Sequence, residues 1–208
     1  MAEEKKSYKA STGVDEFYYA VIDETGAAVT IGTPERVKFL QTISIEMPQE
    51  AVRAYGDNKT AEIAVSSGNT TVTSAFHKLP DEDKAVLFGL EKTKGGLYSF
   101  GSNDTPPYVA CVFAKTFGDG SKEWVGLTKG IFMRPNIEGK TKEDGVDFSS
   151  EEISAEFMDR EVDGFVEEKS VIFGRDAKGV TAQRDELFTA VFGKSYPGTN
   201  GEPGGVEG

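Results

Sequence analysis

Short stretches in which apolar and polar residues alternate dominate this chain, and they predict a mainly β protein. Residues 17–22 are aromatic and β-branched and end at the turn signal Asp23-Glu24-Thr25-Gly26, after which residues 27–31 predict the returning strand of a hairpin. The second half of residues 36–47 alternates with period two. The same reasoning predicts further strands over residues 61–65, 71–77, 108–117, 123–133, 148–158 and 162–173.

Two segments instead carry helix signals. Pro80 and three acidic residues open the first, at residues 80–88, and Gly89 ends it. The second covers residues 181–192, where one apolar stripe precedes Gly193. Many short strands with two helices predict a mainly β fold with a small α content, arranged as a two-sheet antiparallel β-sandwich or barrel with one or two flanking helices.

The chain of 208 residues divides into three expected parts. Residues 1–14 have no periodicity and are expected to form a flexible N-terminal arm, and residues 196–208 are expected to form a flexible Gly/Pro-rich tail. Between them, residues 15–195 are expected to form one domain. Within it, residues 47–68 break the strand pattern, and we expect there a long inter-strand loop.

Composition narrows the possible partners. The chain has 35 acidic and 23 basic residues, a net charge of −12, which argues against gripping nucleic acid through its phosphates or docking on an anionic membrane. No apolar run is long enough to span a bilayer, and no secretory signal is visible. An apolar content of only 38% predicts a core that is thin or shared with partner subunits.

No set of residues demands catalysis, a metal or a cofactor. His77 is interpreted as a surface or turn residue and Cys111 as a buried structural one. Glu138, Glu143, Asp144 and Asp147 are interleaved with lysines, which favours a solvated loop over a cation site.

The aromatic residues have two interpretations, as core filling or as subunit contacts, and the sequence does not separate them. They are Tyr18, Tyr19, Phe39, Tyr55, Phe113, Trp124, Phe132, Phe165 and Phe192.

Ordered blocks of residues then resemble the major tail proteins of siphophages, the subunits of the phage tail tube. The opening block is Phe17-Tyr18-Tyr19-Ala20-Val21-Ile22-Asp23-Glu24, followed by Gly32-Thr33-Pro34-Glu35-Arg36. Later blocks are Tyr55-Gly56-Asp57-Asn58, Pro107-Tyr108-Val109-Ala110 and the segment from Arg134 to Gly145. The resemblance covers about residues 15–195.

The resemblance implies a structural virion protein, not an enzyme. Such subunits form hexameric rings that stack into a hollow tube around the tape-measure protein, and the tube conducts double-stranded DNA into the bacterium without specific binding. It further implies tail terminator and baseplate or distal tail proteins as partners, no membrane partner, no cofactor, and synthesis in the host cytoplasm before incorporation into the virion.

A tube or ring subunit of a related secretion or tailocin system is the alternative function, and a small β-sandwich binding protein or enzyme is a distant one. For the tail-tube function, we expect residues 47–68 to reach a neighbouring subunit or ring through Pro48, Arg53, Tyr55, Gly56, Asp57 and Asn58. The acidic character suggests a lumen that repels phosphates and lets DNA slide.

Overall fold

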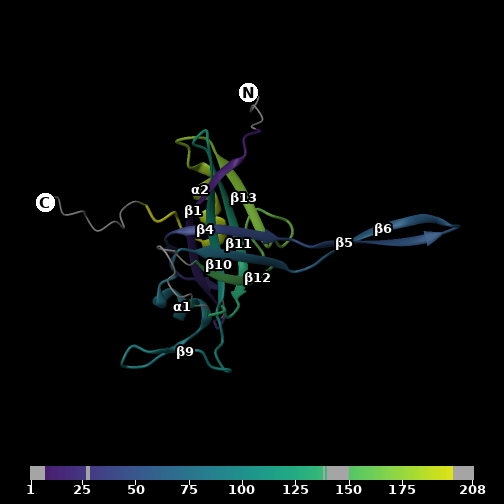
Figure 1. The fold of residues 1–208 in the computed structure, drawn as a ribbon. Helices are drawn as coiled ribbons and strands as arrows, with labels where there is room; N and C mark the ends of the chain where they lie inside the picture. Colours follow the sequence, from purple (N-terminus) through teal and green to yellow (C-terminus); the bar gives the residue numbers. More distant parts are fainter. Residues whose placement is uncertain (1–7, 27–28, 138, 140–149, 199–208) are drawn as a thin grey trace, which may run out of the picture.

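In the computed structural model, the described residues are 8–26, 29–137, 139 and 150–198, and they form thirteen strands and two helices. Figure 1 shows their arrangement in space. In chain order these are β1 (Ser11–Asp23), β2 (Thr30–Ile31), β3 (Glu35–Val37), β4 (Leu40–Glu46), β5 (Gln49–Gly56), β6 (Lys59–Ser67), β7 (Thr70–Phe76), α1 (Asp81–Phe88), β8 (Glu91–Lys92), β9 (Tyr98–Ser99), β10 (Tyr108–Phe117), β11 (Lys122–Phe132), β12 (Glu151–Met158), β13 (Val171–Asp176) and α2 (Ala182–Phe192).

Nine of these strands pair into one antiparallel sheet in the order β2-β1-β10-β11-β12-β7-β4, with β3 beside β1 and β13 beside β11. The expectation of a mainly β fold with two helices is confirmed, but the expectation of two separate sheets is wrong. The reason is the long strand β11: its first half pairs with β13 and its second half with β12, so one strand belongs to both layers.

The sheet folds over on itself. Strand β3 pairs with β1, and three residues beyond its end the chain enters β4, which pairs with β7 at the other end of the strand order. Strands β1 and β4 lie in contact without a ladder between them. The result is a sheet curled around a core and close to a barrel.

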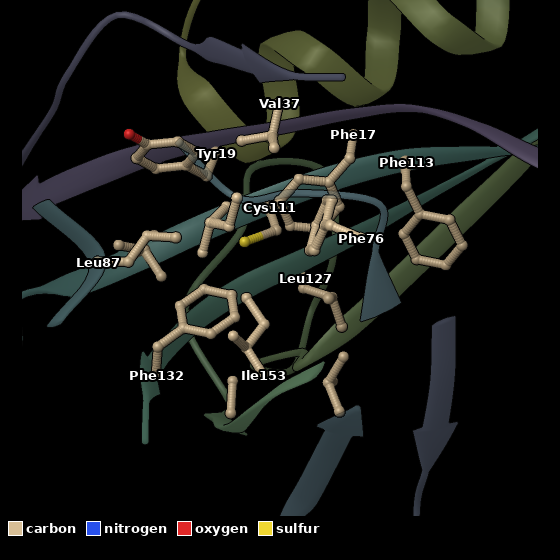
Figure 2. Close-up of a cluster of buried hydrophobic side chains, with 14 of the residues drawn as sticks. Phe17, Tyr19, Val37, Phe76, Leu87, Cys111, Phe113, Leu127, Phe132 and Ile153 are labelled. Atoms are coloured by element: carbon tan, nitrogen blue, oxygen red, sulfur yellow. The ribbon is translucent and has the colours of Figure 1, made fainter. Parts of the chain in front are cut away.

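The side chains of β1 alternate between two cores. Phe17 and Tyr19 enter the first core, between the folded layers and α1, where Figure 2 shows them near Phe76 and Cys111. Tyr18, Ala20 and Ile22 face the second core, which α2 covers. Strand β1 is therefore buried on both faces, which explains its continuous apolar run.

Both helices end as predicted. Gly89 and Gly193 follow α1 and α2 in the left-handed conformation, with φ of 63° and 65°. Helix α2 packs tightly on β11 at Gly126, where an added Cβ would lie 2.5 Å from Val191 Cγ2. No helix of the described ranges is long and apolar enough to cross a membrane.

Asp176, at the end of β13, holds the first turn of α2. Its side chain is buried and accepts hydrogen bonds from the backbone N–H groups of Gln183 and Arg184, both at 2.9 Å. These two N–H groups have no acceptor within the helix, and the Thr181 side chain makes no capping hydrogen bond. The Asp176 carboxylate is therefore the acceptor that caps the helix.

Replacing this carboxylate is therefore expected to destabilise the monomer. Asp176→Ala leaves two buried donors unpaired and should lower the free energy of unfolding by about 2 kcal/mol. Urea denaturation followed by circular dichroism measures the change, with the exposed Asp159→Ala as the matched control. An Asp176→Ala protein as stable as the control would contradict this role.

The edges of several predicted elements differ from expectation. Residues 162–170 were predicted as strand, but the strand β13 begins only at Val171. The preceding segment is held instead by an isolated bridge between Arg160 and Lys169 and by Thr128 Oγ1, which donates a hydrogen bond to the Lys169 carbonyl at 2.5 Å. Strand β1 begins at Ser11, inside the expected N-terminal arm. Residues 1–7 and 199–208 of the expected arm and tail lie outside the described residues.

Candidate assembly interface

The segment expected to be a long loop, residues 47–68, is a β-hairpin instead, so that expectation is wrong. Strands β5 and β6 pair from Gln49↔Ser67 to Gly56↔Lys59. The turn residues Asp57 and Asn58 have positive φ angles of 50° and 61°, the pair of conformations that a two-residue hairpin turn requires. In Figure 1 the hairpin projects far from the body of the fold.

The six residues predicted for the interface all lie on this hairpin or at its base. Pro48 closes the base, where its carbonyl accepts a hydrogen bond from the Gly68 N–H at 2.9 Å. Arg53 and Tyr55 lie on β5, and Gly56, Asp57 and Asn58 form the tip. The structure thus brings them onto one projecting element, and their role in assembly remains a prediction.

The two faces of the hairpin differ in character. Residues directly opposite each other share a face, so Ala51 and Val65, and Arg53 and Ile63, lie on one side. Strand alternation adds Tyr55 to this side, which we call the apolar hairpin face: Ala51, Arg53, Tyr55, Ile63 and Val65. The other side carries Glu50 and Glu62 beside Val52 and small residues.

The apolar hairpin face has no cover within the described chain. Tyr55 is 72% exposed, Val65 63% and Ile63 58%. The strands of the hairpin contact chiefly each other, and a two-stranded hairpin alone is at best marginally stable in water. Its exposed apolar face is the kind of surface that marks an interaction site. Ala51, Ile63 and Val65 were not predicted as interface residues, although Ile63 and Val65 lie in the strand predicted over residues 61–65.

The aromatic residues now separate into two groups. Those that fill the cores are Tyr18, Tyr19, Phe113, Trp124, Phe132 and Phe192. Phe39, Tyr55 and Phe165 are exposed, by 72%, 72% and 48%. Phe39 also has a positive φ of 66° at the turn into β4, a strained conformation for a large residue. The core interpretation is confirmed for the buried residues, and a role of the three exposed ones in subunit contacts stays a prediction.

A second surface is the outward face of β4, β7 and β12, where three strands present hydroxyl and carboxylate groups. Their ladders align the outward residues in rows, with Glu46, Thr71 and Glu156 in one row and Ser44, Thr73 and Ser154 in the next. Glu152 lies outward in the third row, with Thr42 and Ala75. These rows contain no lysine or arginine. Lys129, which adjoins this acidic sheet face on β11, is already paired with Glu24 (Nζ–Oε1 2.6 Å).

Apart from the short strands β2 and β3, which pair only with β1, two strands of the large sheet leave an edge without a partner among the described strands. Strand β4 pairs only with β7, and β13 pairs only with β11. Unpaired edges are templates for pairing with another chain. The hairpin, the exposed aromatic residues and these edges are separate features without a partner in the described part of the chain.

A polar network fixes the C-terminal segment to β1. At a bulge in β1, Glu16 adopts a positive φ of 53°, and its carboxylate binds Lys122 Nζ and accepts a hydrogen bond from Tyr196 Oη at 2.7 Å. Burial lowers the pKa of Lys122, but the hydrogen bonds and charges of Glu16 and Asp15 outweigh it and raise the pKa overall. The lysine therefore stays charged and keeps the network closed.

The candidate catalytic residues do not form an active site. His77 is exposed and packs edge-on against Phe39, and Cys111 is fully buried, which raises the pKa of its thiol and keeps it protonated. Within the described ranges, no three His, Cys, Asp or Glu side chains are grouped so that they could hold a metal ion. The acidic loop residues Glu138, Glu143, Asp144 and Asp147 lie outside the described residues.

The fold and these surfaces define a β-rich structural subunit with a projecting hairpin. A sequence profile of the family described as phage tail tube protein matches residues 40–196, well over half of the chain, and the chain belongs to that family. It is a structural component of the phage tail in the virion and not an enzyme. The resemblance described from the sequence is confirmed.

No curated protein matches the chain. Among solved structures, a chain in the "Cryo-EM structure of the anti-feeding prophage (AFP) baseplate, 6-fold symmetrised" is similar over 86% of this chain and 100% of its own, with 8% sequence identity and a TM-score of 0.41. A similarity at this level supports no argument about function.

Proposed function

We propose that this chain is the tail-tube subunit that polymerises as stacked hexameric rings around the tape-measure protein and conducts double-stranded DNA during infection. The family membership supports the general role in the tail tube. The observation that carries the assembly step is the projecting β5–β6 hairpin, whose apolar face is exposed in the isolated subunit.

Ring formation accounts for the unpartnered features. A neighbour in the ring covers the open edges of β4 and β13, and burial of the apolar hairpin face removes its exposed side chains from water. The stacking of rings is a head-to-tail association, which builds an open filament. Pro48, Gly56, Asp57 and Asn58 set the base and tip of the hairpin, and Arg53 and Tyr55 make contacts with the neighbour.

The acidic sheet face is assigned to the bore. Glu46, Glu152 and Glu156 repel phosphates, and the Thr and Ser side chains between them offer no cation to hold the DNA backbone. DNA therefore passes without being retained. The tape-measure protein occupies the same bore before ejection, and the terminator and distal tail proteins bind the two ends of the tube.

Reversing the charge of this face is expected to make the bore retain DNA. Tubes carrying Glu46→Lys, Glu152→Lys and Glu156→Lys, assembled with short duplex DNA at low salt, should hold DNA that a nuclease cannot digest, because lysines gain counterion-release energy from each phosphate. Gel analysis after nuclease treatment measures the protected DNA.

The matched control reverses three exposed acids between β12 and β13, with Glu161→Lys, Glu167→Lys and Glu168→Lys. This variant has the same total charge, and the DNA that it binds should stay accessible to nuclease. Protected DNA in the control tubes and none in the first variant would contradict the assignment of the bore.

The proposed function itself is tested by polymerisation of the purified chain. Concentrated protein, with or without a tape-measure fragment, should form hollow tubes or rings in negative-stain electron microscopy. A chain that remains monomeric at every concentration and with every tail partner would refute the proposal.

A further inference from the structure

We infer that the apolar hairpin face of one copy lies in a groove between β13 and α2 of a second copy. This inference rests on the proposed function, because it names the receiving surface for the tube contact. The groove has a volume of about 490 Å³ and is lined by β13, by α2 and by residues 163–165. Every lining residue belongs to the described part of the chain.

The floor of the groove matches the hairpin in polarity. Ile172 and Leu187 form its buried part, and Phe165, which is 48% exposed, extends it to the surface. The hairpin offers Tyr55, Ile63 and Val65 for this floor. Exposed aromatic and aliphatic side chains on both surfaces are the composition of an interface centre.

The charges are complementary as well. Asp163, Asp185 and Glu186 line the groove, and no lysine or arginine does. Asp185 is already paired with Arg184 at 2.8 Å, whereas Asp163 and Glu186 have no ion pair in the described chain. The apolar hairpin face carries one charged residue, Arg53, and no acid. Arg53 is thus the cation that two unpaired carboxylates at the groove can receive.

The geometry of the edge favours the same occupant. The groove takes three successive residues of β13, Ile172 to Gly174, and the outer edge of this strand has no partner among the described strands. Each of the two strands of the projecting hairpin has a free outer edge that can approach the edge of β13. The hairpin points away from its own body in Figure 1, so the groove that it enters belongs to another copy.

Charge reversal tests the pairing. We expect Arg53→Glu or Glu186→Arg alone to raise the critical concentration for polymerisation at least about tenfold, and the double variant to return it to within about threefold of the unchanged protein. Sedimentation of polymer across a concentration series measures the critical concentration.

The controls are Glu62→Arg, on the opposite hairpin face, and Glu167→Arg, beside the groove but not among its lining residues. Both should change the critical concentration less than about twofold.

A crosslink tests the geometry independently. The pair Ile63→Cys and Ala190→Cys should give a ladder of disulfide-linked oligomers in oxidised tubes, and the native Cys111 is buried and does not compete. Tubes that form normally with Arg53→Glu, a double variant that polymerises no better than the single variants, or tubes without a disulfide ladder would overturn the groove assignment alone.

If removal of residues 199–208 has the effect of Glu186→Arg and the double variant fails to polymerise, the tail occupies the groove instead and the inference is wrong. Failure of the unchanged protein to polymerise would refute the proposed function as well.

Discussion

Replacing residues 49–67 by two glycines should leave a folded monomer that no longer polymerises. The ends of the cut are already adjacent, because Gly68 N–H donates to the Pro48 carbonyl at 2.9 Å, and no buried core residue lies between them. Loss of the apolar hairpin face should raise the critical concentration by more than about 100-fold, equivalent to about 2.7 kcal/mol. Circular dichroism, thermal unfolding and negative-stain microscopy of the same sample measure fold and assembly together.

The extent of the deletion matters. A shorter cut, of residues 49–59, would remove β5 and leave β6 without its partner. A hairpin in which Asp57 and Asn58 are replaced by two glycines is the control, because it keeps the turn and both faces and should polymerise normally. Normal tubes from the full deletion would refute the role of the hairpin.

Phe188→Ala should destabilise the monomer by about 3–5 kcal/mol. Phe188 is fully buried on α2, and its ring lies 5.2 Å from that of Tyr18, 6.0 Å from Trp124 and 5.0 Å from Tyr196. Truncation leaves a cavity at the point where α2, β1, β11 and the C-terminal segment meet, and it removes three edge-to-face ring contacts. Urea denaturation of the monomer measures the change in the free energy of unfolding.

The substitution Phe173→Ala should affect polymerisation without affecting the stability of the monomer. Phe173 is exposed on the edge strand β13, so its truncation should change monomer stability by less than about 0.5 kcal/mol while weakening polymerisation. The two substitutions are thus expected to act on different measurements. A Phe188→Ala monomer as stable as Phe173→Ala would contradict the assignment of the second core.

The sequence predicts best where local signals and burial agree. Strand β10 matches its predicted range, and α1 and α2 end at the expected glycines, because an apolar run or a helix stop is written in adjacent residues. Strand β5 was missed because both of its faces are exposed, so Ala51 and Arg53 on one side differ little from Val52 and Ala54 on the other. Apolar and polar residues alternate clearly along a strand only when one of its faces is buried.

Long-range pairing explains the remaining differences. The single sheet follows from the two partners of β11, which pairs with β13 near Trp124 and with β12 near Ile131, and nothing local in the strand indicates that division. The groove combines residues 163–165 with α2, and the acidic sheet face combines residues 46, 152 and 156 from two strands distant in sequence. The net charge of −12 indicated the character of this face but not its place.

A cryo-EM reconstruction of tubes polymerised from this chain tests the central claim most directly. We expect the outward face of β4, β7 and β12 to line the bore with Glu46, Glu152 and Glu156, and each β5–β6 hairpin to lie against a neighbouring copy. A bore lined by another face, with these acids on the outer surface and the hairpin free in solvent, would contradict the account.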